Sequence, residues 1–237
     1  MNFDCFICCA EKDERMLNYC IASLKNITNF KGTVYVCSNF EVEKKLPDVI
    51  YLRDEAIDLM GKNIKALRYG KGWLKQQLFK LLQPFTNDLF LVIDADTIIN
   101  KPITLTYGEF LISVDFEYAV FNNVIKHMGL DPEPGINYIA EIMLFDRKII
   151  QELIPAIFGS TEGLIRFIER ETSDYWVFSE FETYGHYFAK HYSDLHSIKK
   201  INSLQIEQEA FTLKEIENII NTNPQADVIS CHCRSQK

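Results

Sequence analysis

Apolar runs and helix-spaced apolar positions alternate along the first half of the chain. Residues 3–10 are almost continuously apolar and precede the polar residues 11–15, which predicts a buried strand that runs into a loop and a helix. Apolar side chains recur at helical spacing in residues 16–24, and residues 32–38 and 49–52 again resemble strands. Strand, helix and strand within about forty residues predict a parallel sheet with right-handed crossovers.

A long helical stretch precedes the most apolar strand. Residues 64–82 have helical spacing, and we expect Gly70 and Gly72 to kink or divide this helix and Pro84 to end it. Residues 89–93 read Leu-Phe-Leu-Val-Ile, which is typical of a central parallel strand covered on both faces. The predicted fold is therefore α/β, with a central, mostly parallel sheet flanked by helices.

The second half of the chain is less regular. A proline-rich segment at 131–135 predicts a surface turn. The remaining apolar patterns predict strands at 118–121, 141–145 and 228–233 and helices at 148–157, 164–170 and 179–190.

Composition limits the number of domains and the class of partner. The chain has 237 residues, 47% of them hydrophobic, and its 10 Gly and 7 Pro form no linker, so we expect a single domain over 1–237. A formal net charge of -8 argues against sequence-independent nucleic-acid binding, which depends on clustered Lys and Arg. An acidic protein can still bind an anionic nucleotide when a divalent cation supplies positive charge.

The N-terminus and the cysteines indicate a compartment. No basic segment precedes the first apolar run, and no run approaches the roughly 18 apolar residues of a membrane span. Seven cysteines, an odd number, fit free thiols in a reducing environment. We expect a cytoplasmic protein, with at most peripheral attachment to a membrane.

The strongest chemical signal is the segment Asp94-Ala95-Asp96. Two carboxylates at the carboxyl end of a buried strand lie where open α/β sheets place ligands. Such oxygen ligands bind Mg²⁺ or Mn²⁺, ions that usually also coordinate substrate phosphates. Asp-x-Asp also occurs by chance, but the five apolar residues that run directly into it favour a functional site.

Phosphatases of the haloacid-dehalogenase class offer a rival interpretation. They also place Asp-x-Asp after an apolar strand, with the first Asp as nucleophile. In that class the motif opens the chain, whereas 93 residues precede Asp94 here, and the acidic pair that such enzymes use for Mg²⁺ is not found after Asp96. The phosphatase hypothesis is therefore less favoured.

Three motifs together resemble those of a known family. They are Gly72-Trp73-Leu-Lys-Gln76-Gln77, the Asp-x-Asp segment, and Ser179-Glu180-Phe181-Glu182-Thr-Tyr184-Gly185. In this order the chain resembles the GT-A glycosyltransferases, and more closely a bacterial and viral group of glycosyltransferases with a GT-A-like (Rossmann-like) domain. The resemblance covers nearly the whole chain. It implies a nucleotide-sugar-binding half at 1–100 and an acceptor-binding and catalytic half at 101–237.

The resemblance also implies a metal site for Mn²⁺ or Mg²⁺. Asp96 would ligate the ion, Asp94 would reach the donor ribose or a metal-bound water, and His232 is the candidate third ligand. An ordinary histidine near the chain end is an equal alternative for His232. The ion would bridge the two phosphates of a nucleoside-diphosphate sugar and stabilise the leaving diphosphate.

Further donor contacts are expected on both sides of the metal strand. Ala10, Lys12 and Asp13 occupy the place where the family holds the nucleotide base, although charges at a helix start are also simply favoured by the helix dipole. The other candidates are Arg68, Lys75, Gln76 and Ala95. For the two cations, Arg68 and Lys75, a position on a solvated helix face is the simpler explanation.

Two glutamates are candidates for the catalytic base. Ser179 and Glu182 have the spacing of a capping box, in which Glu182 would reach back to the Ser179 backbone. That leaves Glu180 to take the proton of the acceptor hydroxyl, as an inverting transferase requires. We therefore expect a metal-dependent glycosyltransferase acting on a glycan or glycoconjugate acceptor in polysaccharide biosynthesis, with Glu180 favoured over Glu182. A non-catalytic sugar-nucleotide or glycan-binding module and a sugar-phosphate nucleotidylyltransferase are alternatives, although the glycine-rich loop of the latter is lacking.

Overall fold

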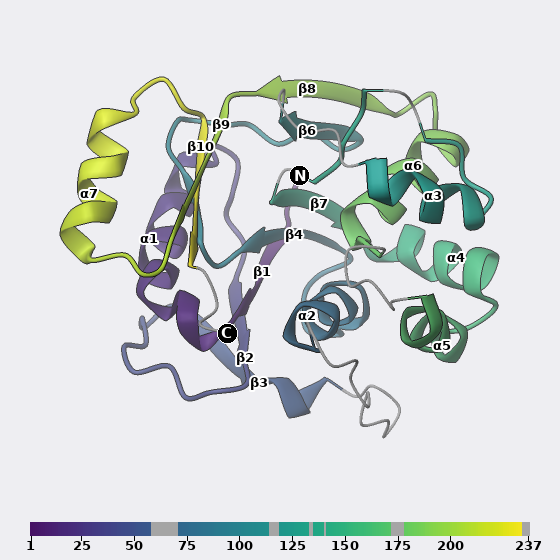
Figure 1. Cartoon of the computed structure of the whole chain (residues 1–237), viewed down its shortest axis with the longest axis horizontal. Coiled ribbons are helices and arrows are strands. Elements are labelled where there is room, and N and C mark those ends of the chain that lie inside the picture. The colour runs from purple at the N-terminus through teal and green to yellow at the C-terminus, as the bar shows by residue number, and fades with distance from the viewer. Residues whose placement is uncertain (58–70, 114–118, 133–134, 140, 172–177, 234–237) are drawn as a thin grey trace.

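A five-stranded sheet of order β3-β2-β1-β4-β7 forms the centre of the protein (Figure 1). The computed structural model describes residues 1–57, 71–113, 119–132, 135–139, 141–171 and 178–233. Strands β1 (Asp4–Cys9), β2 (Val34–Ser38), β3 (Val49–Arg53) and β4 (Leu89–Asp94) run parallel, and β7 (Ile142–Asp146) pairs antiparallel with β4. The predicted α/β fold with a mostly parallel sheet is confirmed.

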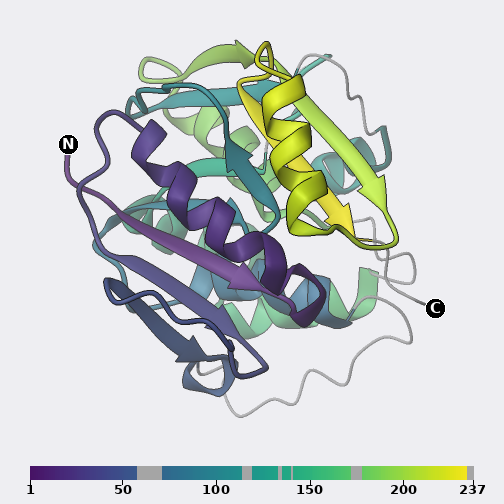
Figure 2. The same ribbon diagram turned by 90° about the vertical axis from the view of Figure 1, so that its left-hand side faces the viewer.

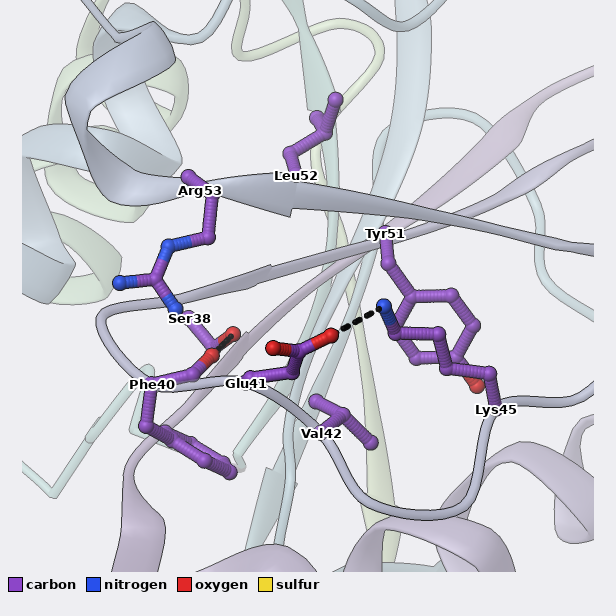
Figure 3. A pocket seen from close by; sticks show the side chains of 8 residues that line it. All are labelled: Ser38, Phe40, Glu41, Val42, Lys45, Tyr51, Leu52 and Arg53. Atoms are coloured by element: carbon purple, nitrogen blue, oxygen red, sulfur yellow. Dashed lines mark hydrogen bonds and ion pairs between the residues drawn. The ribbon is translucent and has the colours of Figure 1, made fainter.

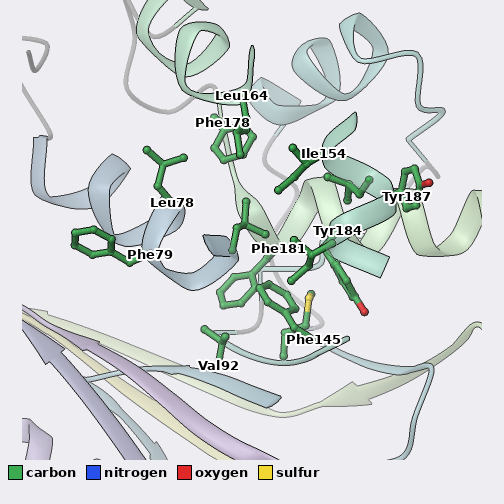
Figure 4. Packing of buried hydrophobic residues seen from close by; sticks show 14 of the residues in the cluster. Leu78, Phe79, Val92, Phe145, Ile154, Leu164, Phe178, Phe181, Tyr184 and Tyr187 are labelled. Carbon is green, nitrogen blue, oxygen red and sulfur yellow. The ribbon is translucent and has the colours of Figure 1, made fainter. Parts of the chain in front are cut away.

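Helices cover both faces of this sheet, and the strand sequences show why. Side chains of a strand alternate between faces, and in β4 Phe90 and Val92 pack on one side while Leu91 and Ile93 pack on the other. Helix α1 (Glu14–Ser23) covers the Leu91 side (Figure 2). The apolar cluster on the Val92 side, which Figure 4 shows in part, includes residues of α2 (Lys71–Leu82), α3 (Ala119–His127), α4 (Arg147–Phe158), α5 (Thr161–Glu171) and α6 (Glu180–His191).

A second, smaller sheet packs against α1. It has the order β5-β10-β9, with β5 (Thr97–Ile99), β10 (Val228–Cys233) and β9 (Ser203–Gln208), and it packs against helix α7 (Leu213–Thr222). Figure 2 shows α7 beside β9 and β10. Two strands, β6 (Glu109–Ser113) and β8 (Ser197–Ile201), pair in parallel as a separate ribbon.

The remaining helices are short. They are η1 (Glu11–Asp13), η2 (Leu24–Asn26) and η3 (Asp54–Ala56). Among the helices that the structure describes, none combines the length and the apolar character needed to cross a membrane.

Most predicted elements are confirmed, and one is wrong. The first four strands, the helices at 16–24, 148–157, 164–170 and 179–190, and the strands at 141–145 and 228–233 are all found, with bounds that differ by a few residues. The predicted helix at 64–82 is confirmed from Lys71 onward, since 58–70 lie outside the described residues. Residues 119–121 belong to helix α3, not to a strand. Phe121, Val124 and Ile125 are buried at helical spacing, and a four-residue window is too short to reveal that period.

The strand order indicates where a ligand would bind. The chain passes from β1 outward to β2 and β3, and then returns to the other side of β1 to form β4. In open α/β sheets, ligands bind outside the carboxyl ends of the strands where the order reverses in this way. Here that point lies between the ends of β1 and β4, at Ala10 and Asp94.

Candidate functional site

Asp94 faces helix α2 because it continues the alternation of β4. Phe90 and Val92 face that helix, so the next even position does too. The Asp94 Oδ1 atom accepts hydrogen bonds from Lys80 Nζ at 2.6 Å and from Gln76 Nε2 at 3.1 Å. Gln76 and Lys80 reach the same oxygen because residues four apart share one side of a helix.

Lys80 connects Asp94 to the start of helix α6. Its Nζ atom donates to Glu180 Oε1 at 2.7 Å, and both side chains are only 3% exposed. Burial alone would lower the pKa of Lys80, but Asp94 and Glu180 raise it. Burial raises the pKa of Glu180, and Lys80 offsets part of that rise. We call Gln76, Lys80, Asp94 and Glu180 the lysine cluster.

Asp96 lies on the opposite side, next to strand β10. The Asp96 carbonyl accepts a hydrogen bond from Cys231 N at 2.9 Å, which brings β10 to the end of β4. His232 Nδ1 is 3.0 Å from Asp96 Oδ2, and His232 Nε2 is 3.0 Å from Glu141 Oε1. We call Asp96, Glu141 and His232 the histidine cluster.

His232 is cationic in this arrangement. Burial favours the neutral ring, but hydrogen bonds to Asp96 and Glu141 raise the pKa of His232 to about 11. Burial raises the pKa of Glu141, and the contact with His232 opposes that rise. A protonated imidazole between the two carboxylates therefore offsets part of their negative charge.

The turn after β1 contacts the end of β10. Lys12 Nζ lies 2.9 Å from Asp13 Oδ1 and 3.2 Å from the Cys233 carbonyl, while Ala10 is exposed. Burial and the negative charge of Asp96 raise the pKa of Asp13 to about 6. The turn expected to hold the base therefore lies within electrostatic reach of the Asp-x-Asp segment.

Lys75, another predicted contact, lies away from both clusters. Lys75 Nζ pairs with Asp54 Oδ2 at 2.8 Å, at the end of β3, and its side chain is 42% exposed. Ala95 is buried in the turn between Asp94 and Asp96. Arg68 lies outside the described residues.

Glu182 does not complete the predicted capping box. Ser179 does cap α6, since its Oγ accepts a hydrogen bond from Glu182 N. The Glu182 carboxylate instead accepts from Tyr138 N at 2.8 Å and contacts His186 Nε2 at 3.1 Å. Glu182 is therefore satisfied inside the protein, whereas Glu180 joins the lysine cluster.

A divalent cation fits the spacing between Asp96 and His232. Adjacent ligands about 2.1 Å from an octahedral ion are about 3.0 Å apart, and Asp96 Oδ2 and His232 Nδ1 are separated by 3.0 Å. An imidazole nitrogen suits transition metals, so the pair fits Mn²⁺ better than Mg²⁺. Asp94 does not join them, because its carboxylate faces Lys80. Within the part of the chain that the structure describes, no three His, Cys, Asp or Glu side chains form a group that could hold a metal ion.

The structure also contains a cavity of about 600 Å³ (Figure 3). It lies between the ends of β2 and β3 and the segment that connects them, where Glu41 and Lys45 form an ion pair of 3.4 Å. None of its lining residues belongs to either cluster. They are Ser38, Phe40, Glu41, Val42, Lys45, Tyr51, Leu52 and Arg53.

Sequence reasoning missed two residues of the site. Lys80 follows Gln76 by one helical turn, so its position on the same side of α2 was readable from the predicted helix. Glu141 is the first residue of the strand predicted at 141–145, and no sequence pattern connects it with His232, 91 positions later.

Comparison with known proteins gives a likeness of fold. No protein-family model matches the sequence, and no curated protein matches it significantly. The solved structures that resemble the chain include the apo structure of the bifunctional glycosyltransferase WbbM, with a TM-score of 0.54 and 12% sequence identity. The match covers 99% of this chain and 46% of that one, so the chain spans about half the length of that protein. At this identity the likeness shows that the two proteins share a fold.

Proposed function

We propose that the protein is a metal-dependent glycosyltransferase that uses a nucleoside-diphosphate sugar. The observation that carries the proposal is the pairing of Asp96 with His232 at 3.0 Å, next to Asp94 and at the reversal point of a mostly parallel sheet. The similarity in fold to a bifunctional glycosyltransferase supports it. In this proposal 1–237 form one domain, with donor binding in 1–100 and acceptor binding and catalysis in 101–237.

Asp96 and His232 would hold the cation. Bound there, Mn²⁺ would supply positive charge to the diphosphate and stabilise it as it leaves the sugar. Asp94 would orient the donor ribose or a metal-bound water, and Lys80 keeps its carboxylate in place through the 2.6 Å contact. Lys12 and Asp13 would contact the nucleotide base from the turn after β1.

Glu180 would act as the general base in an inverting reaction. Its carboxylate would take the proton of the acceptor hydroxyl as that oxygen attacks the anomeric carbon. Burial raises the pKa of Glu180, which suits a base working near neutral pH, and Lys80 keeps the group ionised. Glu182 is the weaker candidate, because both of its oxygens already have partners within the fold. The acceptor would be a glycan or another glycoconjugate.

Donor binding is the first test. In a thermal-shift titration with nucleoside diphosphates and their sugars, a true ligand at about a hundred times its Kd adds about 2.7 kcal/mol to stability. We expect a shift that requires Mn²⁺ and disappears in Asp96→Asn, while Asp48→Asn, a change at an exposed site, keeps it. A shift that is the same without Mn²⁺, or in Asp96→Asn, would refute the metal assignment.

The catalytic base needs a separate test. Glu180→Gln should lower kcat roughly a hundredfold or more, the usual effect of losing a general base, while donor affinity stays unchanged. Donor binding without transfer in the wild-type protein, across a panel of glycan acceptors, would instead support a non-catalytic binding module.

A further inference from the structure

Glu141 lies at the point where the two sheets meet. Its carbonyl accepts a hydrogen bond from Asp94 N at 3.1 Å, in the central sheet. Its carboxylate reaches the second sheet, where Oε1 contacts His232 Nε2 at 3.0 Å and Gln205 Nε2 at 3.1 Å, and Oε2 contacts Thr97 Oγ1 at 3.4 Å. One residue therefore links the Asp-x-Asp segment to the strand that carries His232.

We propose that Glu141 is a positioning residue for the metal site, and that its carboxylate orients His232 so that Nδ1 faces Asp96. This inference rests on the proposed function, in which Asp96 and His232 bind the cation. His232 is cationic without the metal, so binding of the cation would displace the proton on Nδ1 and leave a neutral imidazole, which has one N–H and one lone pair. When Glu141 accepts the Nε2–H, the lone pair is left on Nδ1, 3.0 Å from Asp96 Oδ2. Metal-binding histidines generally donate their other N–H to a carboxylate or carbonyl in this way, and losing that partner weakens metal binding.

Neighbouring side chains hold the Glu141 carboxylate in place beside His232. The residue is 4% exposed, and Gln205 and Thr97 occupy the positions beside His232. Thr97 Oγ1 in turn contacts Ser230 Oγ at 3.3 Å, on the same strand as His232. The carboxylate is therefore fixed relative to β10, and the ring that it contacts is fixed with it.

The backbone of Glu141 is held in an unusual conformation. Its φ is +59°, which is uncommon for a residue other than glycine and carries strain. Glycine would adopt the same backbone conformation without strain. The presence of glutamate at this position is therefore explained by the contacts of its side chain and not by the conformation of the turn. Glu141→Gly is consequently a variant that removes the carboxylate while relieving the backbone.

The experiment measures the Kd of Mn²⁺ on the folded protein by electron paramagnetic resonance, with circular dichroism to verify the fold. Glu141→Gly should raise this Kd by about 10- to 100-fold, the scale for losing the hydrogen-bonding partner of a metal ligand. Glu141→Gln keeps an oxygen that accepts from His232 Nε2 and should restore most of the affinity. The matched control is Asn100→Ala, which removes two hydrogen bonds from the residue after β5 to the segment between α7 and β10, at the Asn223 and Ala226 carbonyls and away from His232.

The outcomes separate this inference from the function on which it rests. Weak Mn²⁺ binding in Glu141→Gly, with rescue in Glu141→Gln and wild-type affinity in Asn100→Ala, supports it. Wild-type affinity in Glu141→Gly, while Asp96→Asn abolishes binding, overturns the role of Glu141 and leaves the metal site standing. Equal weakening in Glu141→Gly and Asn100→Ala assigns Glu141 a purely structural role. No Mn²⁺ binding in the wild-type protein overturns both.

Discussion

Replacing Lys80 by Met should destabilise the protein in a way that depends on pH. Lys80 is the buried cation between Asp94 and Glu180, at 2.6 and 2.7 Å. Met has a similar length and no charge, so Lys80→Met leaves two carboxylates without their partner. Breaking a buried ion pair from one side generally costs about 3–5 kcal/mol. Asp94 is 23% exposed and can recover water, but Glu180 is 3% exposed and cannot.

Protonation of Glu180 sets the size of the loss. In the variant, Glu180 escapes the penalty of a buried charge by binding a proton, and its pKa rises further. Each pH unit above the ordinary carboxyl pKa of 4.5 then costs about 1.4 kcal/mol. The free energy of unfolding should therefore fall by about 3 kcal/mol at pH 7 and by about 1 kcal/mol at pH 5. The loss is larger at the higher pH because Glu180 has a higher pKa in the folded variant than in the unfolded chain. The folded variant therefore becomes less stable as pH increases.

Urea unfolding followed by circular dichroism at both pH values measures this difference. The matched control is Lys75→Met, whose side chain is 42% exposed and pairs with Asp54 at 2.8 Å; a pair of this kind is worth about 1 kcal/mol or less. Adding Glu180→Gln to Lys80→Met should recover most of the loss at pH 7. Equal losses for Lys80→Met and Lys75→Met, or a loss at pH 7 no larger than at pH 5, would refute the reasoning.

Two further predictions concern residues around the site. Asp13→Asn should stabilise the protein by about 1–3 kcal/mol at pH 8 and by little at pH 4. Burial and Asp96 raise the Asp13 pKa from 3.8 to about 6, so the wild-type protein loses stability as pH increases from 3.8 to about 6. Thermal unfolding at both pH values measures this, and a pH-independent effect would contradict it. Gly185→Ala should destabilise by about 1–3 kcal/mol, because a Cβ there would lie 2.3 Å from Tyr138 Cγ; an unchanged melting temperature would contradict this prediction.

The amino-acid sequence by itself determined the central sheet and the location of the site. Five apolar residues predict β4 because a strand covered on both faces needs apolar side chains at every position. Asp94 and Asp96 stand out because they end that run. Helix α6 was predictable as well, since Ser179 marks its first turn. These features are local, so nearby residues specify them.

Local patterns failed where the segment was short or half exposed. β8, with the sequence Ser-Ile-Lys-Lys-Ile, has only two apolar residues, and its pairing partner β6 lies nearly ninety positions earlier. The sequence at 118–121 was too short to distinguish a strand from the first turn of α3. Helix α7 did carry a readable signal, a capping box of Thr212 and Glu215, which the sequence reading overlooked.

Only the tertiary structure decided how the charged residues are grouped. Asp94 and Asp96 are two positions apart, but the first pairs with Lys80 and the second with His232. The chain turns between them, so one carboxylate follows the alternation of β4 and the other faces β10. Glu180 and Glu182 are also two positions apart, but Glu180 belongs to the lysine cluster and Glu182 contacts Tyr138. Three of these four contacts join residues 44 to 136 positions apart, so they depend on how sheets and helices pack together, and no local pattern of residue types specifies that packing.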